Sequence, residues 1–184
     1  MAINEIEKIA KHIPLLCLGG VRGGSIFFIK ILLILSKKSS MKIKIREFVI
    51  SDYHHIVELW KEAKLPYKPN GRDSKESIEK ELQKGYCNFL VAEDNNKIVG
   101  SILGTNDGRK GWVNRLAVKT EYRKKGLANQ LLEELEKIFN ELGIGIIACL
   151  IEDDNPDSLK VFSKFGYSEF KGMHYLTKKK HSEI

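Results

Sequence analysis

The sequence has few of the residues that crosslink chains or bind metals. Its 184 residues include three cysteines and five histidines. Cys17, Cys87 and Cys149 are too few and too scattered for a disulfide framework, and Cys87 and Cys149 lie in apolar runs typical of buried thiols. His54 and His55 are adjacent, so on a helix they would point about 100° apart, and no other spacing suits a metal. We therefore expect neither a disulfide scaffold nor a metal cofactor.

A hydrophobic run long enough to span a membrane is also missing. The best candidate, residues 26–35, is ten residues long and contains Lys30, whereas a membrane-spanning helix needs roughly 20 apolar residues. Extending this run back to Ile13 adds four glycines and Arg22. Residues 36–39 lack the small-residue pattern of a secretory cleavage site. We therefore expect a cytoplasmic protein.

Residues 1–40 differ from the rest of the sequence. From Met41 onward, apolar and polar residues alternate at once. We favour Met41 as the native start over the alternative, a membrane-associating segment that uses residues 26–35 as an interfacial anchor. The expected organisation is an N-terminal extension at 1–40, one domain at 41–178 and a basic tail at 179–184. Contact with a membrane is expected only if the extension belongs to the native protein.

The charge is unevenly distributed. The net charge is +7, but residues 1–40 hold six basic and two acidic residues, which leaves 25 basic and 22 acidic residues in 41–184. No basic stripe with interleaved aromatics is present apart from the short lysine run at 178–180, which is typical of a solvated chain end. This balance suits an anionic small molecule better than a nucleic acid, so we expect no nucleic-acid partner.

Hydrophobic periodicity predicts one mixed α/β domain, with a mostly antiparallel sheet flanked by helices. The predicted order is one strand, two helices, three strands, then helix, strand, helix and strand. A nearly continuous apolar run at 145–151 predicts a central strand covered on both faces. Strands are predicted at residues 43–49, 87–93, 97–105, 111–118, 145–151 and 167–177, and helices follow Asp52, Ser74, Arg123–Lys125 and Asn155.

The most informative segment is residues 123–128, which lead from a predicted strand into a predicted helix. The first turn of a helix leaves backbone N–H groups unpaired, and the helix dipole adds positive potential there. A pyrophosphate binds well at such an end. Gly126 lets the backbone approach a phosphate without a β-carbon, and Arg123, Lys124 and Lys125 add positive charge. The loop matches neither a P-loop nor the dinucleotide-binding glycine pattern.

Two motifs resemble those of the GNAT family of acetyl-CoA-dependent N-acetyltransferases. Arg123, Gly126 and Ala128 occupy the three positions of its motif A, which reads Arg/Gln-x-x-Gly-x-Gly/Ala after a strand. Residues 155–167 are similar to its motif B, with Asn155 first and a Phe-Gly-Tyr ending. The resemblance covers residues 41 to about 177 and implies the family's acyl-CoA N-acyltransferase fold.

The resemblance implies that acetyl-CoA is the co-substrate. It implies that backbone groups of residues 116–118 hold the pantetheine arm, that residues 123–128 hold the pyrophosphate, and that Asn155 contacts the cofactor near the thioester. Asn155 equally suits a plain helix N-cap, and the side chains of 116–118 suit the sheet core. The cofactor-binding residues implied are Leu116, Ala117, Val118, Arg123, Lys124, Lys125, Gly126, Leu127, Ala128 and Asn155.

The family's usual catalytic side chains are missing. Many members carry a tyrosine seven residues after the motif B asparagine, where this sequence has Phe162, and one subgroup carries a glutamate where it has Leu150. Glu152 could accept the proton of the amine directly or through water, unless it is an exposed loop carboxylate. Asn114 could orient the amine or a water, unless it is buried structural polarity. These absences also keep open an alternative, a non-catalytic acyl-CoA-binding or regulatory domain.

The amine acceptor is expected against the two early helices and the loop at 67–73. Within that loop Tyr67 and Arg72 are candidate substrate-binding residues, because an arginine pairs well with a substrate carboxylate. Asp73 suits an N-cap of the following helix. The residues do not distinguish a protein N-terminus, a lysine, a polyamine or a drug as the acceptor. A homodimer is compatible with folds of this kind, although no patch in the sequence argues for one.

Overall fold

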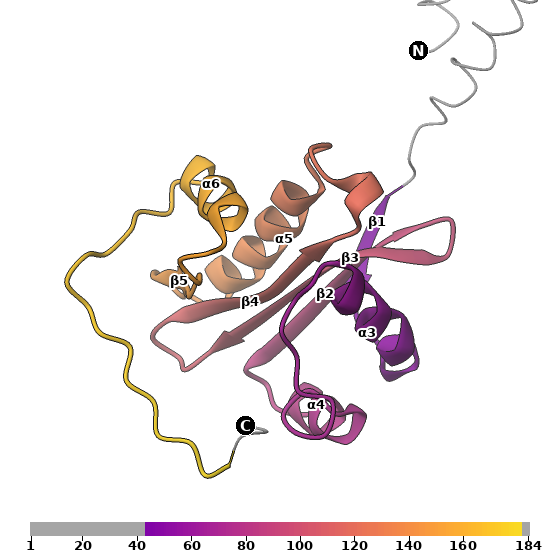
Figure 1. Ribbon diagram of the computed structural model, residues 1–184, viewed down its shortest axis with the longest axis horizontal. Helices are drawn as coiled ribbons and strands as arrows, with labels where there is room; N and C mark the ends of the chain where they lie inside the picture. The colour runs from indigo at the N-terminus through magenta and orange to yellow at the C-terminus, as the bar shows by residue number, and fades with distance from the viewer. Residues whose placement is uncertain (1–42, 182–184) are drawn as a thin grey trace, which may run out of the picture. The chain divides into compact units, whose positions relative to one another are not determined.

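The computed structural model describes residues 43–181 of the chain (Figure 1). The predictions for residues 1–40, which concern the start of the native protein and a membrane anchor, lie outside the described residues. Among the described residues, no helix is both long enough and apolar enough to cross a membrane.

The described residues form a mixed sheet of five strands in the order β1-β2-β3-β4-β5 (Figure 1). The first four strands pair antiparallel, and β5 pairs parallel to β4, which confirms the predicted sheet type. The strands are β1 (Lys44–Glu47), β2 (Cys87–Asp94), β3 (Lys97–Asn106), β4 (Gly111–Val118) and β5 (Ile147–Cys149).

Helices cover both faces of this sheet. On one face α3 (Tyr53–Glu62) and α4 (Lys75–Leu82) pack on a core cluster built around Trp60. On the other face lie α5 (Leu127–Glu141) and α6 (Pro156–Lys164), with Phe139 and Phe162 in the second cluster. Each helix buries one apolar stripe, as the period of the sequence predicts. The site described below is lined by residues of β3, β4, β5, α4 and α6 and of the loops beside them.

Helix caps follow the prediction at two of three starts. The Ser74 side chain accepts a hydrogen bond from the backbone N–H of Ser77 and begins α4, and the Asn155 side chain accepts from Ser158 and begins α6. Asp52, in contrast, makes no side-chain cap for α3. Its carboxylate accepts instead from the backbone N–H of Val49 and from the guanidinium of Arg46.

The prediction of a central strand at 145–151 is wrong. Only Ile147–Cys149 pairs with β4, and β5 lies at the edge of the described sheet. Ile146 and Leu150 are 55% and 60% exposed. A continuous apolar run is typical of a strand buried on both faces, but here the paired part is three residues long, and Ile147, Cys149 and Ile151 pack only partly buried against the α5 side of the core.

The strand predicted at 167–177 is also wrong. The structure assigns no strand to these residues, and Phe170 and Leu176 are 78% and 89% exposed. The backbone N–H of Tyr167 donates to the carbonyl of Phe162 at 3.0 Å, which is a contact with α6 and not with the sheet. Strand propensity depends strongly on context and does not make a strand by itself, and Gly172, at φ +82°, interrupts the extended run.

Candidate active site

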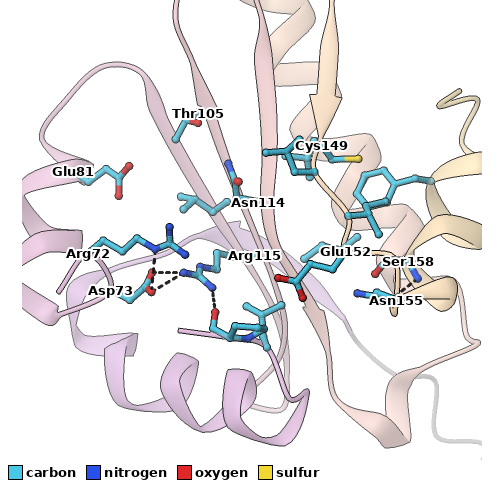
Figure 2. Close-up of a pocket in the computed structure, with 18 residues that line it drawn as sticks. Arg72, Asp73, Glu81, Thr105, Asn114, Arg115, Cys149, Glu152, Asn155 and Ser158 are labelled. Carbon is cyan, nitrogen blue, oxygen red and sulfur yellow. Dashed lines mark hydrogen bonds and ion pairs between the residues drawn. The ribbon is translucent and has the colours of Figure 1, made fainter. Parts of the chain in front are cut away.

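The site is centred where β4 leaves its parallel neighbour. β4 pairs with β5 only from Gly111 to Val113, so residues 114–118 have β3 on one side and no described strand on the other. A pocket of about 440 Å³ opens at this point (Figure 2). Its lining comes from the loop before α4, from α4 itself, from β3 and β4, and from the segment that joins β5 to α6.

A β-bulge shapes β4 at the pocket. Ser101 of β3 lies opposite Ala117, and Leu103 lies opposite Asn114, so two residues of β4 face Ile102 alone. One of the two is Arg115, whose φ of +53° is uncommon for a residue with a β-carbon. Ser101 donates from Oγ to the Arg115 carbonyl at 3.0 Å. The bulge therefore reorients the backbone of β4 just where the strand loses β5.

The Arg115 side chain ties this bulge to the loop before α4. Its Nη2 donates to both carboxylate oxygens of Asp73 at 2.6 Å, and its Nη1 donates to the Pro66 carbonyl. The guanidinium also lies over the Trp60 ring, 5.0 Å from the centroid. Burial lowers the pKa of Arg115 and the Asp73 charge opposes that shift; an arginine stays charged in either case.

Asp73 therefore does not cap α4, and that prediction is wrong. Besides Arg115, its carboxylate accepts the backbone N–H of Lys68 at 2.7 Å. Both side chains of the ion pair are nearly buried, at 11% exposure for Arg115 and 9% for Asp73. The pair fixes the loop at 66–73 against β4, so one wall of the pocket is held by a buried, multiply bonded contact.

Polar side chains from four elements line the α4 side of the pocket (Figure 2). Glu81 reaches it from the last turn of α4, Thr105 from β3, Asn114 from β4 and Arg72 from the loop. Burial raises the pKa of Glu81, and Asp73 raises it further, although the charges of Lys84 and Arg115 oppose the shift. Asn114 is exposed, and its Nδ2 donates to the Trp112 carbonyl at 3.4 Å, so it is not a buried structural group.

The opposite side of the pocket comes from the end of β5 and the start of α6. Glu152 and Asn155 lie there, and both are exposed. The Asn155 side chain caps α6 through Ser158 at 3.1 Å, yet it also faces the pocket, so both interpretations of this residue are compatible with its position. Figure 2 shows the Glu152 carboxylate on the side of the pocket opposite Glu81.

Phe162 occupies the motif B position that would carry a catalytic tyrosine. It is 5% exposed and meets Tyr167 edge to face, with 5.0 Å between ring centroids. Burial and a 2.8 Å hydrogen bond to Glu136 raise the pKa of Tyr167, so this hydroxyl is committed elsewhere. Burial likewise raises the pKa of the pocket thiol Cys149 to about 11, which keeps it neutral and a weak nucleophile at pH 7.

The start of α5 has the geometry that anion binding requires. Gly126 is its N-cap at φ +81°, and a β-carbon there would meet nothing within 4 Å. Glycine is therefore needed for its backbone angle, and the space above it is open to a ligand. Residues 123–126 are exposed. Arg123 donates from Nε to the Val118 carbonyl at 3.0 Å and so links the loop to the end of β4.

The structure brings most of the predicted residues toward one region. Asn114, Leu116, Glu152, Asn155 and Arg72 line the pocket. Ala117 and Val118 continue β4 and are buried, so only their backbone remains for a ligand. Lys125 lies with Nζ 5.5 Å from the centroid of Tyr122.

Of the two candidate substrate-binding residues, Arg72 lines the pocket, whereas Tyr67 lies elsewhere. It does not line the pocket, and its ring lies 6.3 Å from that of Trp60 in the α3-side core. Sequence reasoning missed Arg115 and Glu81, which do line it. A charged residue in the middle of a buried strand was the available signal for Arg115. Nothing in the helical pattern distinguished Glu81 from the other acidic residues of α4.

The fold is similar to that of solved N-acetyltransferases. The aminoglycoside N-acetyltransferase AAC(6')-Iy in complex with a bisubstrate analogue is 18% identical, with a TM-score of 0.63 over 74% of this chain and 98% of that one. The PaiA N-acetyltransferase from Thermoplasma acidophilum in complex with coenzyme A is 26% identical, with a TM-score of 0.62 over 68% of this chain and 89% of that one. Glucosamine-6-phosphate N-acetyltransferase from Arabidopsis thaliana is 17% identical, with a TM-score of 0.60 over 76% of this chain and 99% of that one.

The family model named Acetyltransferase (GNAT) family matches residues 53–167. This range is more than half of the chain, so the chain belongs to that family. It contains both motifs on which the resemblance rested, and it confirms the predicted family, fold class and enzyme class: the protein is an acetyl-CoA-dependent N-acetyltransferase.

Proposed function

We propose that the protein transfers the acetyl group of acetyl-CoA to a primary amine held in the pocket beside the β4 bulge. The observation that carries this proposal is the position of the pocket. It opens where β4 loses β5, and it is bordered by the bulge, by Glu152 and by the loop that Arg115 fixes. Acetyl-CoA reaches it from the start of α5, and an amine reaches it from the α4 side.

The residues at the start of α5 fit a pyrophosphate. The unpaired N–H groups of the first turn, the dipole of a 15-residue helix and three basic side chains favour negative charge there. The backbone of Leu116, Ala117 and Val118 has no described strand beside it on the β5 side, so its N–H and C=O groups can pair with the amides of the pantetheine arm. Asn155 would contact the arm near the thioester.

The chemistry requires a neutral amine, a stabilised oxyanion and a leaving thiolate. The amine nitrogen attacks the thioester carbonyl, a C–N bond forms, the C–S bond breaks, and the amine loses one proton. Asn114 orients the amine, and Glu152 accepts the proton directly or through a water. Phe162 cannot protonate the departing thiolate, but a thiol has a pKa of about 8.5, so the thiolate can leave unprotonated.

Small-molecule amines are the first acceptors to test. The solved structures named above include enzymes of aminoglycosides and of glucosamine 6-phosphate, and both are amine-bearing small molecules. We place the protein in the cytoplasm, where acetyl-CoA is available. A protein lysine or N-terminus remains within the proposed class.

Glu152→Gln tests the proposed base. We expect kcat/KM to fall by about 100-fold, as removal of a general base does. The measurement is thiol release from acetyl-CoA by the full chain, with the acetylated amine identified by mass spectrometry. Asp153→Asn is the matched control, since this neighbouring carboxylate does not line the pocket. Unchanged kcat/KM across pH would remove Glu152 from the mechanism.

The same assay separates the enzyme from a non-catalytic acyl-CoA-binding domain. Binding of acetyl-CoA by the wild-type chain, with no thiol release on any amine of a broad panel, would favour the binding domain and contradict the proposal.

A further inference from the structure

Glu81 is a carboxylate that faces the pocket without a partner. It lies in the last turn of α4, is half-buried, and lines the pocket (Figure 2). Among the described residues, no hydrogen bond or ion pair involves the Glu81 carboxylate. The positive charges of Lys84 and Arg115 lower its pKa without direct contact. A carboxylate that loses water without gaining a partner destabilises the empty protein, so its position suggests a ligand.

The other charges of the pocket are already compensated or have another role. Asp73 is held by Arg115 at 2.6 Å, and Arg72 lies 3.7 Å from the same Asp73 carboxylate. Glu152 lies on the far side of the pocket, beside Asn155 (Figure 2). The lining has three carboxylates against two guanidinium groups, and the excess negative charge belongs to Glu152. On the α4 side the two guanidinium groups both lie against Asp73, so Glu81 is the carboxylate on that side that no guanidinium contacts directly.

Thr105 adds a second acceptor atom on the same wall. It is half-buried on β3, opposite Trp112 and two residues from Leu103, which also lines the pocket. No hydrogen bond of its hydroxyl is present among the described contacts. An ammonium group has three N–H donors and no acceptor, so a carboxylate and a hydroxyl on one wall complement it, whereas they give a substrate carboxylate only one donor.

We propose that Glu81, with Thr105, binds a second ammonium group of the acceptor, so that the preferred acceptor is a diamine or polyamine. This inference rests on the proposed function, because the first amino group is the one that is acetylated beside Glu152. The second amino group stays protonated and lies toward α4. Glu81 is thus a specificity-determining residue, and it takes no part in the bond-making step.

The test uses acceptors that differ only in the charge of their far end. The probes are 1,4-diaminobutane, butylamine and 4-aminobutyrate, extended to diamines of three to six carbons with their matching monoamines and amino acids. We expect the wild-type chain to give the highest kcat/KM with a diamine, less with the monoamine and least with the amino acid. A preference for the amino acid would overturn the proposal and assign the far-end contact to Arg72.

Glu81→Gln then tests the residue itself. Loss of a charged hydrogen bond of this kind is expected to lower the diamine-to-monoamine ratio of kcat/KM by at least about ten-fold. Glu79→Gln is the matched control: it makes the same change on the same helix, but Glu79 is exposed and does not line the pocket. An unchanged ratio in Glu81→Gln, or an equal loss with both acceptors, would overturn the proposal.

Failure of this inference differs from failure of the proposed function. If the chain acetylates monoamines or peptide amines but shows no preference for diamines, the diamine site is wrong and the acetyl transfer stands. If no amine releases thiol although acetyl-CoA binds, both are wrong. Acetyl-CoA affinity, measured for each variant by calorimetry, shows that Glu81→Gln and Glu79→Gln are folded.

Discussion

At the scale of single residues, Arg115 does the most to assemble the α4 side of the pocket. It lies in a strand, yet its backbone is in the left-handed region, and its side chain contacts Asp73, Pro66 and Trp60. The Trp60 indole N–H in turn donates to Ser101, whose hydroxyl donates to the Arg115 carbonyl. The side chain and backbone of Arg115 thus connect the bulge in β4 to the loop at residues 66–73.

Removing one partner of this pair leaves the other charge buried. We expect Asp73→Ala to lower the free energy of unfolding by about 3 kcal/mol, because Arg115 would then be uncompensated. The double variant Asp73→Ala with Arg115→Met should lose less than the sum of the single losses by at least about 1 kcal/mol. Urea denaturation of the four proteins measures this coupling, and strictly additive losses would show that the contact contributes nothing.

A second ion pair gives the stability a dependence on pH. Burial favours the neutral form of Asp52, but hydrogen bonds from Arg46 and Val49 and the Arg46 charge outweigh it and lower the pKa of Asp52. A carboxylate with a lowered pKa contributes stability above its unfolded value of about 3.9, and the contribution is lost as the pH falls through the folded value.

We therefore expect wild type to exceed Asp52→Asn in unfolding free energy by a constant amount at neutral pH, and the difference to shrink below about pH 4. Denaturation curves between pH 2 and pH 7 measure it. When the same comparison is made in chains that also carry Arg46→Ala, the change of this free-energy difference with pH should be much smaller. A difference that stays constant to pH 2 would contradict the assignment.

At the scale of elements, the start of α5 was the most predictable part of the site. The sequence predicted a helix start at residues 123–128, and α5 begins at Leu127 with Gly126 as its N-cap; the positive φ of Gly126 was not part of that prediction. The bulge in β4 was not predictable, because a two-residue period cannot show which residue lacks a partner on the next strand. The position of Glu81 in the pocket was not predictable either, because α4 has three glutamates and the sequence does not show which of them faces a pocket.

Glycines at the two ends of α5 provide a matched pair of substitutions. Gly126 and Gly143 have φ of +81° and +73°, and a β-carbon at either would meet nothing within 4 Å. Each change to alanine should therefore cost about 1 kcal/mol of stability through backbone strain alone. Only Gly126→Ala should raise KM for acetyl-CoA, by about ten-fold, because its β-carbon occupies the space above the phosphate-binding turn. Equal KM values in both variants would contradict a pyrophosphate at this helix start.

Strand predictions failed where the outcome depended on a distant partner. Residues 145–151 and 167–177 both have strand-like composition, but the first keeps only Ile147–Cys149 in the sheet and the second has no assigned strand. Helix signals are local, since caps and apolar stripes lie within one segment. A strand, in contrast, needs a pairing partner from another part of the chain, and the topology of the whole sheet decides which partner it has.

At the scale of the whole molecule, the sheet separates two cores and the site lies across them. The cluster around Trp60 supports the loop and α4, and the cluster with Phe139 and Phe162 supports α5 and α6. The proposed acceptor side therefore depends on the first core, and the proposed acetyl-CoA side depends on the second. The pocket lies where β4 parts from β5, and residues from both cores reach it.

The family motifs predicted the starts of two helices, whereas nothing in them concerns the α4 side of the pocket. Residues 123–128 and Asn155 lie where the motifs imply, at the start of α5 and at the start of α6. The acceptor side is built from Arg115, Asp73 and Glu81, which belong to no motif and come from three separate segments. Their association is a property of the fold, so only the structure could bring them together.

The most direct test of this account is a two-step titration followed by the backbone amide chemical shifts of the nitrogen-15-labelled chain. Acetyl-CoA should first perturb the amides of Leu116–Val118 and of Gly126, Leu127 and Ala128. In the second step, a diamine is added to the complex of the chain with coenzyme A, which has no acetyl group to transfer. The diamine should perturb the amides around Glu81 and Thr105. Perturbations by acetyl-CoA that avoid the start of α5, or by the diamine that avoid the α4 side of the pocket, would contradict the account.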